Sequence, residues 1–163
     1  MSTRKNTLSN VKIHTLLKVR ELNDSSYILR IEKNGMDFIP GQYISIGKKG
    51  SIDKRDYSIY SATDDNFLEV LIREVSDGYV SKTLRKLKPG DEMEVEGPFG
   101  YFRVKQEDLK DKKHLLIASG TGISPFHSMI KSIPDFDYTL IHGIRKGNDA
   151  YEKDDYESER LVL

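Results

Sequence analysis

The chain has 163 residues, enough for one domain with a sizeable hydrophobic core or for two small domains. Its 26 basic and 26 acidic residues cancel, so overall charge favours neither nucleic acid nor a membrane surface as a partner. The absence of cysteine excludes disulfides, cysteine-ligated iron–sulfur clusters and cysteine nucleophiles within these residues. The opening MSTRKNTLSN is polar and no later segment approaches membrane-spanning length, so we expect a cytoplasmic protein without a signal peptide or membrane anchor.

From Val11 to about Val104 the sequence consists of short, alternating, β-branched segments separated by turn signals. The expected strands are residues 11–22, 25–33, 41–48, 55–63, 67–75 and 91–99. A short helix is expected from Ser81 to Leu87, with Ser81 as a plausible N-cap. This spacing predicts a closed, six-stranded antiparallel barrel, which we assign to residues 1–105.

A different pattern follows the charged linker at residues 106–113. The apolar run HLLIAS is typical of a buried parallel strand, and a glycine-rich turn and a helix from Ser124 to about Ile133 come next. Ser124 is the expected N-cap, DYTLIHGIR a second buried strand, AYEKDDYESE a helix and RLVL the start of a third strand. Residues 112–163 therefore match the first part of a doubly wound parallel nucleotide-binding sheet. Because such a sheet would have an uncovered face, we expect the natural polypeptide to continue past Leu163.

The segment Arg55-Asp56-Tyr57-Ser58 combines a cation, an aromatic ring and a hydroxyl on extended chain. Strand alternation places Arg55 and Tyr57 on one side and Ser58 on the other. Such residues can bind a phosphate, stack on a heterocycle and hydrogen-bond its edge. Taken alone, they fit better an ordinary barrel strand with its tyrosine in the core.

Three further segments have a binding and a structural interpretation. The turn at Gly120-Thr121-Gly122 opens a helix and could hold a pyrophosphate, or it could be tight-turn geometry. The segment DGYVSKTL could form a phosphate nest or a connector helix, and GPFGYF could be a site or a bend. The four histidines, His14, His114, His127 and His142, show no metal-ligand spacing, so we expect structural or surface roles and no metal site.

In this order, the segments RDYS, DGYVSKTL, EGPFGYF and LLIASGTGISPF resemble the ferredoxin-NADP(H) reductase family, in particular the bacterial ferredoxin/flavodoxin reductases. The segments PGQY and LIHGIRKGNDAY are also similar to family segments. The resemblance covers nearly the whole chain from Val11 onward. It implies an FAD-binding barrel domain, the N-terminal part of an NAD(P)-binding domain, and FAD and NADP(H) as cofactors.

The resemblance also implies roles for individual residues. Arg55 would hold the flavin phosphate, Tyr57 would stack on the isoalloxazine ring and Ser58 would lie beside the reactive N5. The residues implied at the FAD pyrophosphate are Gly78, Val80, Ser81 and Thr83. Those implied at the phosphates or ribose of the nicotinamide dinucleotide are Gly120, Thr121, Gly122, Pro125 and Arg145.

The implied activity is hydride transfer from NADPH to flavin N5, followed by single-electron steps to an acidic ferredoxin or flavodoxin, by a monomer. Two alternatives stay open: the reductase component of an oxygenase system, and a truncated flavin-binding fragment without catalysis.

Two groups of basic residues could steer an acidic partner or merely solvate the surface. They are Lys48, Lys49 and Lys54, and Lys82, Arg85, Lys86 and Lys88. Three features that the resemblance would imply are not in this sequence. They are the residues that select NADPH over NADH, a cysteine in a later strand and a C-terminal aromatic residue that covers the flavin.

Overall fold

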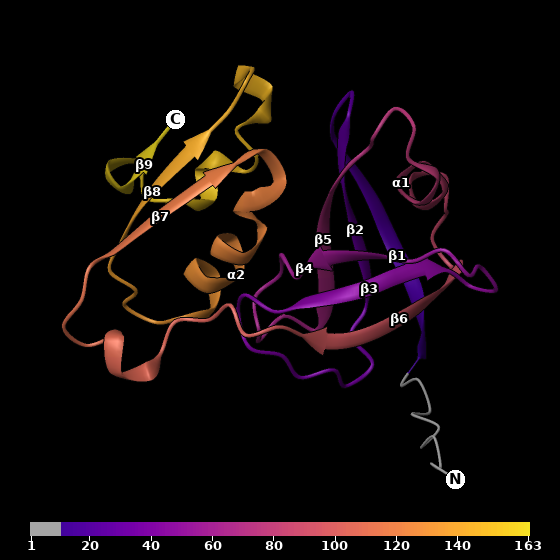
Figure 1. Ribbon diagram of the computed structural model, residues 1–163, viewed down its shortest axis with the longest axis horizontal. Coiled ribbons are helices and arrows are strands. Elements are labelled where there is room, and N and C mark those ends of the chain that lie inside the picture. The colour runs from indigo at the N-terminus through magenta and orange to yellow at the C-terminus, as the bar shows by residue number, and fades with distance from the viewer. Residues whose placement is uncertain (1–10) are drawn as a thin grey trace, which may run out of the picture.

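The computed structural model describes residues 11–163, and residues 1–10, assigned above to the barrel domain, lie outside them. Two sheets lie side by side along the longest axis of the molecule (Figure 1). Six strands form the antiparallel sheet, in the order β4-β3-β6-β1-β2-β5. They are β1 (Lys12–Asn23), β2 (Ser26–Glu32), β3 (Tyr43–Lys48), β4 (Arg55–Ser58), β5 (Phe67–Arg73) and β6 (Glu92–Phe99).

The antiparallel sheet closes into a barrel just after β4. Ile59 forms an isolated bridge with Val70, and the Tyr60 amide donates to the Glu69 carbonyl over 2.7 Å. Strand β4 is shorter than expected because regular pairing ends at Ser58. The alternating strands direct their β-branched and aliphatic residues inward, and helix α1 (Tyr79–Arg85) adds Val80 and Leu84 to this core. The predicted barrel is confirmed.

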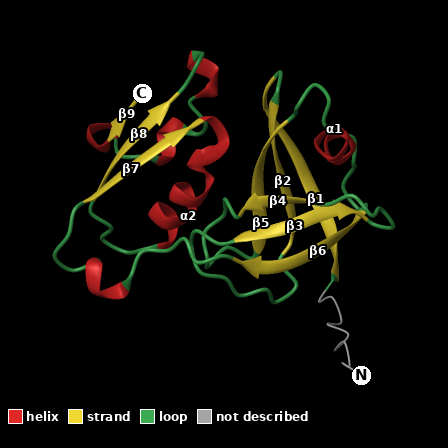
Figure 2. Ribbon diagram, in the orientation of Figure 1, coloured by secondary structure: helices red, strands yellow, loops and turns green. Residues whose placement is uncertain are grey.

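The second sheet is parallel, in the order β7-β8-β9. It comprises β7 (His114–Ser119), β8 (Tyr138–Gly143) and β9 (Leu161–Val162). Helix α2 (Ser124–Ser132) follows the 3₁₀ helix η2 (Gly120–Ile123) and lies between this sheet and the barrel (Figure 2). The opposite face exposes the apolar side chains of Leu115, Ile117, Ile141 and Val162. The predicted strand–helix–strand order is confirmed.

The barrel and the parallel sheet share one hydrophobic cluster. Ile28, Tyr60 and Leu71 of the barrel pack in the same cluster as Met129 of α2 and Leu140 of β8. Burial of apolar area in this cluster is the main force that holds the two sheets together, at roughly 25 cal/mol per Å². The barrel and the parallel sheet are therefore held in one relative position.

Residues 150–159 do not form the predicted helix. The 3₁₀ helices η3 (Gly147–Asp149), η4 (Lys153–Asp155) and η5 (Ser158–Arg160) follow one another instead. Tyr151 and Tyr156 are both buried in the shared cluster. On one α-helix, residues five apart would point about 140° apart, so a regular helix could not direct both rings into the same core. Glu152, with φ of 46°, makes the turn between them.

Strands β7 and β8 were predicted to be buried, but buried and exposed residues alternate along both of them because only one face of this sheet packs against α2. Two further differences concern helix starts. Helix α1 begins at Tyr79, so Ser81 lies inside its first turn and is not the N-cap. Ser124 is the first residue of α2, and its hydroxyl donates backwards to the Thr121 carbonyl over 2.7 Å. Within residues 11–163, every helix falls short of the length and apolar character needed to cross a bilayer.

Candidate functional site

Strand β4 presents Arg55, Asp56 and Tyr57 at one wall of a cavity of about 380 Å³. Arg55 and Tyr57 line it together with Arg73, Gly78 and Ser81. Arg55 is exposed, and its Nη1 donates to the carbonyl of Lys54 over 2.7 Å. Tyr57 is half-buried against the barrel core, and burial raises the pKa of its phenol while the nearby Arg55 lowers it. The cavity thus has a cation, a neutral aromatic ring and a tight turn on its walls.

The turn before α1 is held by the side chain and main chain of Ser81. The Ser81 hydroxyl accepts from the Val75 amide over 3.3 Å, and the Tyr27 hydroxyl donates to the Ser81 carbonyl over 2.5 Å. A Cβ at Gly78 would lie 2.8 Å from Ser81 Oγ and 3.1 Å from Val75 Cβ. Only glycine therefore fits at this position without a shift. The buried Ser81 braces the turn as well as lining the cavity.

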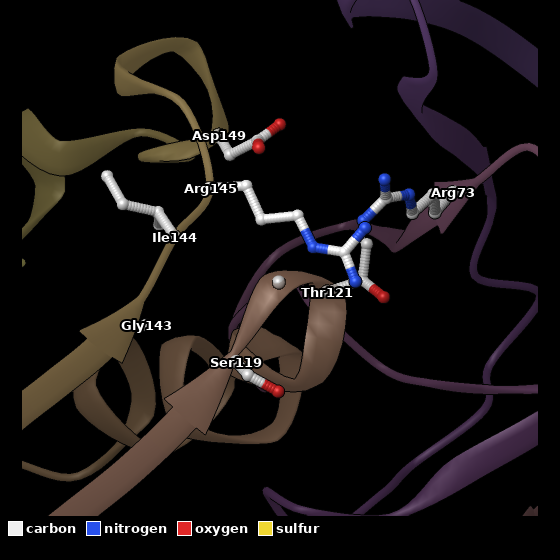
Figure 3. A pocket seen from close by; sticks show the side chains of 8 residues that line it. Arg73, Ser119, Thr121, Gly143, Ile144, Arg145 and Asp149 are labelled. Atoms are coloured by element: carbon white, nitrogen blue, oxygen red, sulfur yellow. The ribbon is translucent and has the colours of Figure 1, made fainter.

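A second cavity of about 330 Å³ lies at the carboxyl ends of the parallel strands. Gly120 and Thr121 follow β7 and line it, and Arg145 follows β8. In open α/β sheets, ligands bind at this edge. Arg73, the last residue of β5, completes the cavity from the barrel side. Figure 3 shows the guanidinium groups of Arg73 and Arg145 facing each other beside Thr121.

Neither of these arginines is ion-paired in the described part of the chain, although the carboxylate of Asp149 also lines the cavity. Neither Arg73 nor Arg145 forms an ion pair or a side-chain hydrogen bond with any of residues 11–163. Two facing cations repel each other, and an anion placed between them removes that repulsion. The cavity therefore has the electrostatic character of an anion-binding site.

Sequence analysis missed Arg73. This residue lines both cavities, so one guanidinium borders the predicted flavin residues and the predicted dinucleotide residues. Its signal in the sequence is a basic residue near the end of an apolar strand, separated by three residues from the DGYVSKTL segment. The sequence gives no sign that the end of this strand faces the end of β8.

The structure gathers some of the predicted residues and leaves others apart. Arg55, Tyr57, Gly78, Val80 and Ser81 line the first cavity. Gly120, Thr121 and Arg145 line the second. Ser58, Thr83, Gly122 and Pro125 line neither cavity. Ser58 is half-buried and pairs with Tyr43 of β3, whereas Gly122 and Pro125 shape the start of α2.

Much of the predicted basic rim is neutralised by glutamates. Lys49 pairs with Glu92 at 2.6 Å, and Lys54 pairs with Glu94 and Glu96 of the same strand. Arg85 pairs with Glu21 at 2.5 Å and with Glu74 at 3.3 Å. These pairs reduce the local positive field that would steer an acidic partner. The pairs weaken the steering interpretation for three of the seven basic residues, Lys49, Lys54 and Arg85, and leave it open for the other four.

The chain was compared with known proteins. The oxidoreductase FAD-binding domain family matches residues 14–104. The toluate 1,2-dioxygenase electron transfer component of Pseudomonas putida is 34% identical over 148 residues, 86% of this chain and 43% of that protein. A ferredoxin–NADP reductase of Azotobacter vinelandii is 33% identical over 156 residues, 90% of this chain and 60% of that protein. The chain thus spans roughly half the length of these relatives.

The fold has close structural counterparts. A ferredoxin NADP+ reductase from Neisseria gonorrhoeae with bound FAD and NADP has a TM-score of 0.80 and 23% identity, covering 90% of this chain and 62% of that one. At 23% identity, this similarity is evidence for a shared fold and not for a shared function. The family match, by contrast, extends over more than half of the sequence. The chain therefore belongs to the oxidoreductase FAD-binding domain family, and the resemblance to ferredoxin-NADP(H) reductases drawn from its motifs is confirmed.

Proposed function

We propose that this chain provides the FAD site and part of the NAD(P)H site of a reductase that passes electrons to a small acceptor protein such as ferredoxin or flavodoxin. The observation that carries the proposal is the pair of cavities at the junction of the sheets, which share Arg73. Family membership and relatives named as reductases and electron transfer components support it.

The first cavity fits a phosphate-bearing aromatic cofactor. Arg55 and Arg73 would hold the flavin's phosphates, and Tyr57 would stack on its ring. Gly78 allows the tight turn at the cavity wall, because a Cβ there would clash with Ser81 and Val75. A bound flavin accepts a hydride from a nicotinamide and releases electrons singly. In this chain, Tyr57 contributes a neutral ring and the Ser58 hydroxyl lies next to it in the strand.

The second cavity fits the anionic part of a nicotinamide dinucleotide. Arg73 and Arg145 would bind its phosphates from opposite sides, and the Gly120-Thr121 turn would add main-chain amides and a hydroxyl. The charge-assisted hydrogen bonds of an arginine to a phosphate are each worth roughly 1.5–3 kcal/mol. Because one arginine comes from each sheet, dinucleotide binding would depend on how the two sheets are docked.

We further infer that these are two domains, the barrel up to residue 105 and the nucleotide-binding part from residue 112. The segment between them contains the 3₁₀ helix η1 (Gln106–Asp108) and belongs to neither sheet. Its backbone would act as a connector, while the shared cluster holds the domains together.

An oxygenase reductase component is the second candidate. The relatives named toluate 1,2-dioxygenase electron transfer component and methane monooxygenase component C, which are 34% and 36% identical over the matched residues, favour it. Because this sequence has no cysteine, any iron–sulfur partner would have to be supplied from outside these residues.

The visible absorption spectrum of the purified protein, before and after anaerobic addition of NADPH and then NADH, tests the proposal. A flavin spectrum that bleaches supports both sites. Flavin that stays oxidised with either dinucleotide would indicate a flavin-binding fragment without catalysis. A colourless protein that takes up no added FAD would refute the flavin site.

A further inference from the structure

His127 lies where the barrel, α2 and the η4 turn meet. It is 4% exposed, and its ring stacks on Tyr60 with centroids 3.7 Å apart. Its Nδ1 is 2.7 Å from the Tyr60 carbonyl oxygen, and its Nε2 is 2.9 Å from Asp155 Oδ2. His14, His114 and His142 each bond only one main-chain carbonyl among residues 11–163. His127 is thus the one histidine of the described chain whose two ring nitrogens both have partners.

These two partners determine how many of the two ring nitrogens of His127 must carry a proton. A carbonyl oxygen and a carboxylate both accept hydrogen bonds, so both ring nitrogens of His127 must donate. A neutral imidazole has only one N–H, and therefore only the imidazolium makes both bonds to an ionised Asp155. The hydrogen bond from His127 is the main cause that lowers the pKa of Asp155, which keeps this carboxylate ionised.

Several charged or titratable groups surround the ring. They are Tyr60 from the segment after β4, Lys131 from α2, and Glu152, Asp155 and Tyr156 from the turn region. Arg20 of β1 pairs with Glu152, and Glu69 of β5 lies 3.8 Å from Arg20. Burial raises the pKa of both tyrosines, so these stay neutral. One ligand atom each of His127, Glu152 and Asp155 lies within 4.8 Å of the others, but Arg20 already pairs with Glu152 and Lys131 lies 3.8 Å from Asp155. A metal ion here would have to displace these pairs.

The same junction connects the two candidate binding sites. Tyr60 lies two residues after Ser58, the last residue of β4. Next to His127, Ser128 Oγ donates to the Ser61 carbonyl over 2.8 Å, and Ser132 Oγ accepts from the Thr63 amide over 3.0 Å. At its other end, α2 continues directly from the Gly120–Ile123 turn. One short helix therefore fixes the flavin-facing strand relative to the dinucleotide turn.

We propose that His127 is a positioning residue whose protonated ring holds β4, α2 and the η4 turn in the geometry needed for electron transfer from dinucleotide to flavin. This inference rests on the proposed function. Loss of one ring proton breaks one of the two hydrogen bonds and loosens the junction. Since a misplacement of about 1 Å can slow a reaction roughly 10²-fold, the rate of flavin reduction then falls.

The variant Asp155→Asn separates positioning from simple packing. The introduced amide can donate to Nε2 of a neutral His127 while Nδ1 still donates to the Tyr60 carbonyl. Both bonds then survive deprotonation. The variant His127→Phe keeps the ring stack and loses both bonds, and Ser132→Ala removes a neighbouring bond of the same interface as a matched control.

The first readout is independent of activity. Nitrogen-15 NMR of the wild-type imidazole should show both nitrogens of His127 protonated, and urea unfolding midpoints should fall with rising pH more in the wild type than in Asp155→Asn. The second readout is the stopped-flow rate of flavin reduction by saturating NADPH in the flavin-loaded protein at several pH values. We expect a drop of about tenfold or more toward alkaline pH in the wild type and in Ser132→Ala, none in Asp155→Asn, and a uniformly low rate in His127→Phe.

Coincident pH profiles for wild type and Asp155→Asn would overturn the inference, as would a His127→Phe variant that loses stability but reduces its flavin at the wild-type rate. A singly protonated His127 at neutral pH would also overturn it. Flavin that is not reduced at any pH would refute the proposed function, and this inference with it.

Discussion

Arg73 provides the sharpest test of the two-cavity site. The variant Arg73→Met removes the guanidinium that lines both cavities and keeps a long apolar side chain at the end of β5. If Arg73 binds a phosphate of the dinucleotide, its loss removes at least one charge-assisted hydrogen bond. Because the side chain is exposed, the lower end of the usual range, about 1.5 kcal/mol, applies. At roughly 1.4 kcal/mol per tenfold, the dissociation constant of NADP+ should rise about tenfold.

The assay is a calorimetric or difference-spectral titration of the flavin-loaded protein with NADP+ at fixed ionic strength. Arg145→Met should weaken binding to a similar extent, since its guanidinium faces that of Arg73. Arg103→Met is the matched control, because Arg103 is also exposed but lines a different cavity near the linker. Only Arg73→Met should in addition weaken the retention of FAD, because Arg145 does not line the first cavity.

Two results would refute this reasoning. Unchanged NADP+ affinity in both Arg73→Met and Arg145→Met would show that the second cavity does not bind the dinucleotide. Equal losses in Arg103→Met would show a general charge effect instead of a site. Thermal unfolding supplies a further check, since removing one of two repelling cations should not destabilise the free protein.

Four other substitutions have defined outcomes. Ser58→Ala should slow flavin reduction in stopped-flow assays while FAD stays bound, and an unchanged rate would remove Ser58 from the site. Gly41→Ala places a Cβ 1.9 Å from the Phe102 carbonyl oxygen at φ of +99° and should cost about 2–5 kcal/mol in urea unfolding. Gly50→Ala, with φ of +78° and no atom within 4 Å, should cost only about 1–2 kcal/mol, so equal losses would contradict the role of crowding. Finally, the lowered pKa of Asp155 means that its ionised form stabilises the fold above its ordinary value of 3.8 and that this contribution is lost as the pH falls below it. Urea unfolding from neutral to acid pH should show a smaller acid-side loss in Asp155→Asn than in the wild type.

Local pattern was sufficient for most of the architecture. The strands were predictable because alternation along the chain directly sets which side chains enter the core. The Gly120 turn and the apolar strands around it were predictable because glycine and a short apolar segment mark a strand-to-helix transition. That these strands are buried on only one face was not predictable from the apolar run. The family was assigned from the order of four motifs along the chain. None of the four motifs alone would have supported that assignment.

Features that depend on contacts between distant segments were not predictable in this way. The helix expected at residues 150–159 fails because Tyr151 and Tyr156 must enter one core, a requirement set by packing and not by propensity. Nothing in the sequence indicates that Lys49, Lys54 and Arg85 form ion pairs, because their glutamate partners lie far away along the chain.

The sequence by itself determined most of the strands, the order of the motifs and the family, because these depend on local spacing. Only the tertiary structure decided that Arg73 of β5 faces Arg145 of the parallel sheet and that His127 meets Asp155. These side chains are far apart along the chain and meet only because the barrel closes and packs against α2. Local sequence patterns do not indicate which distant charged residues become neighbours in this way.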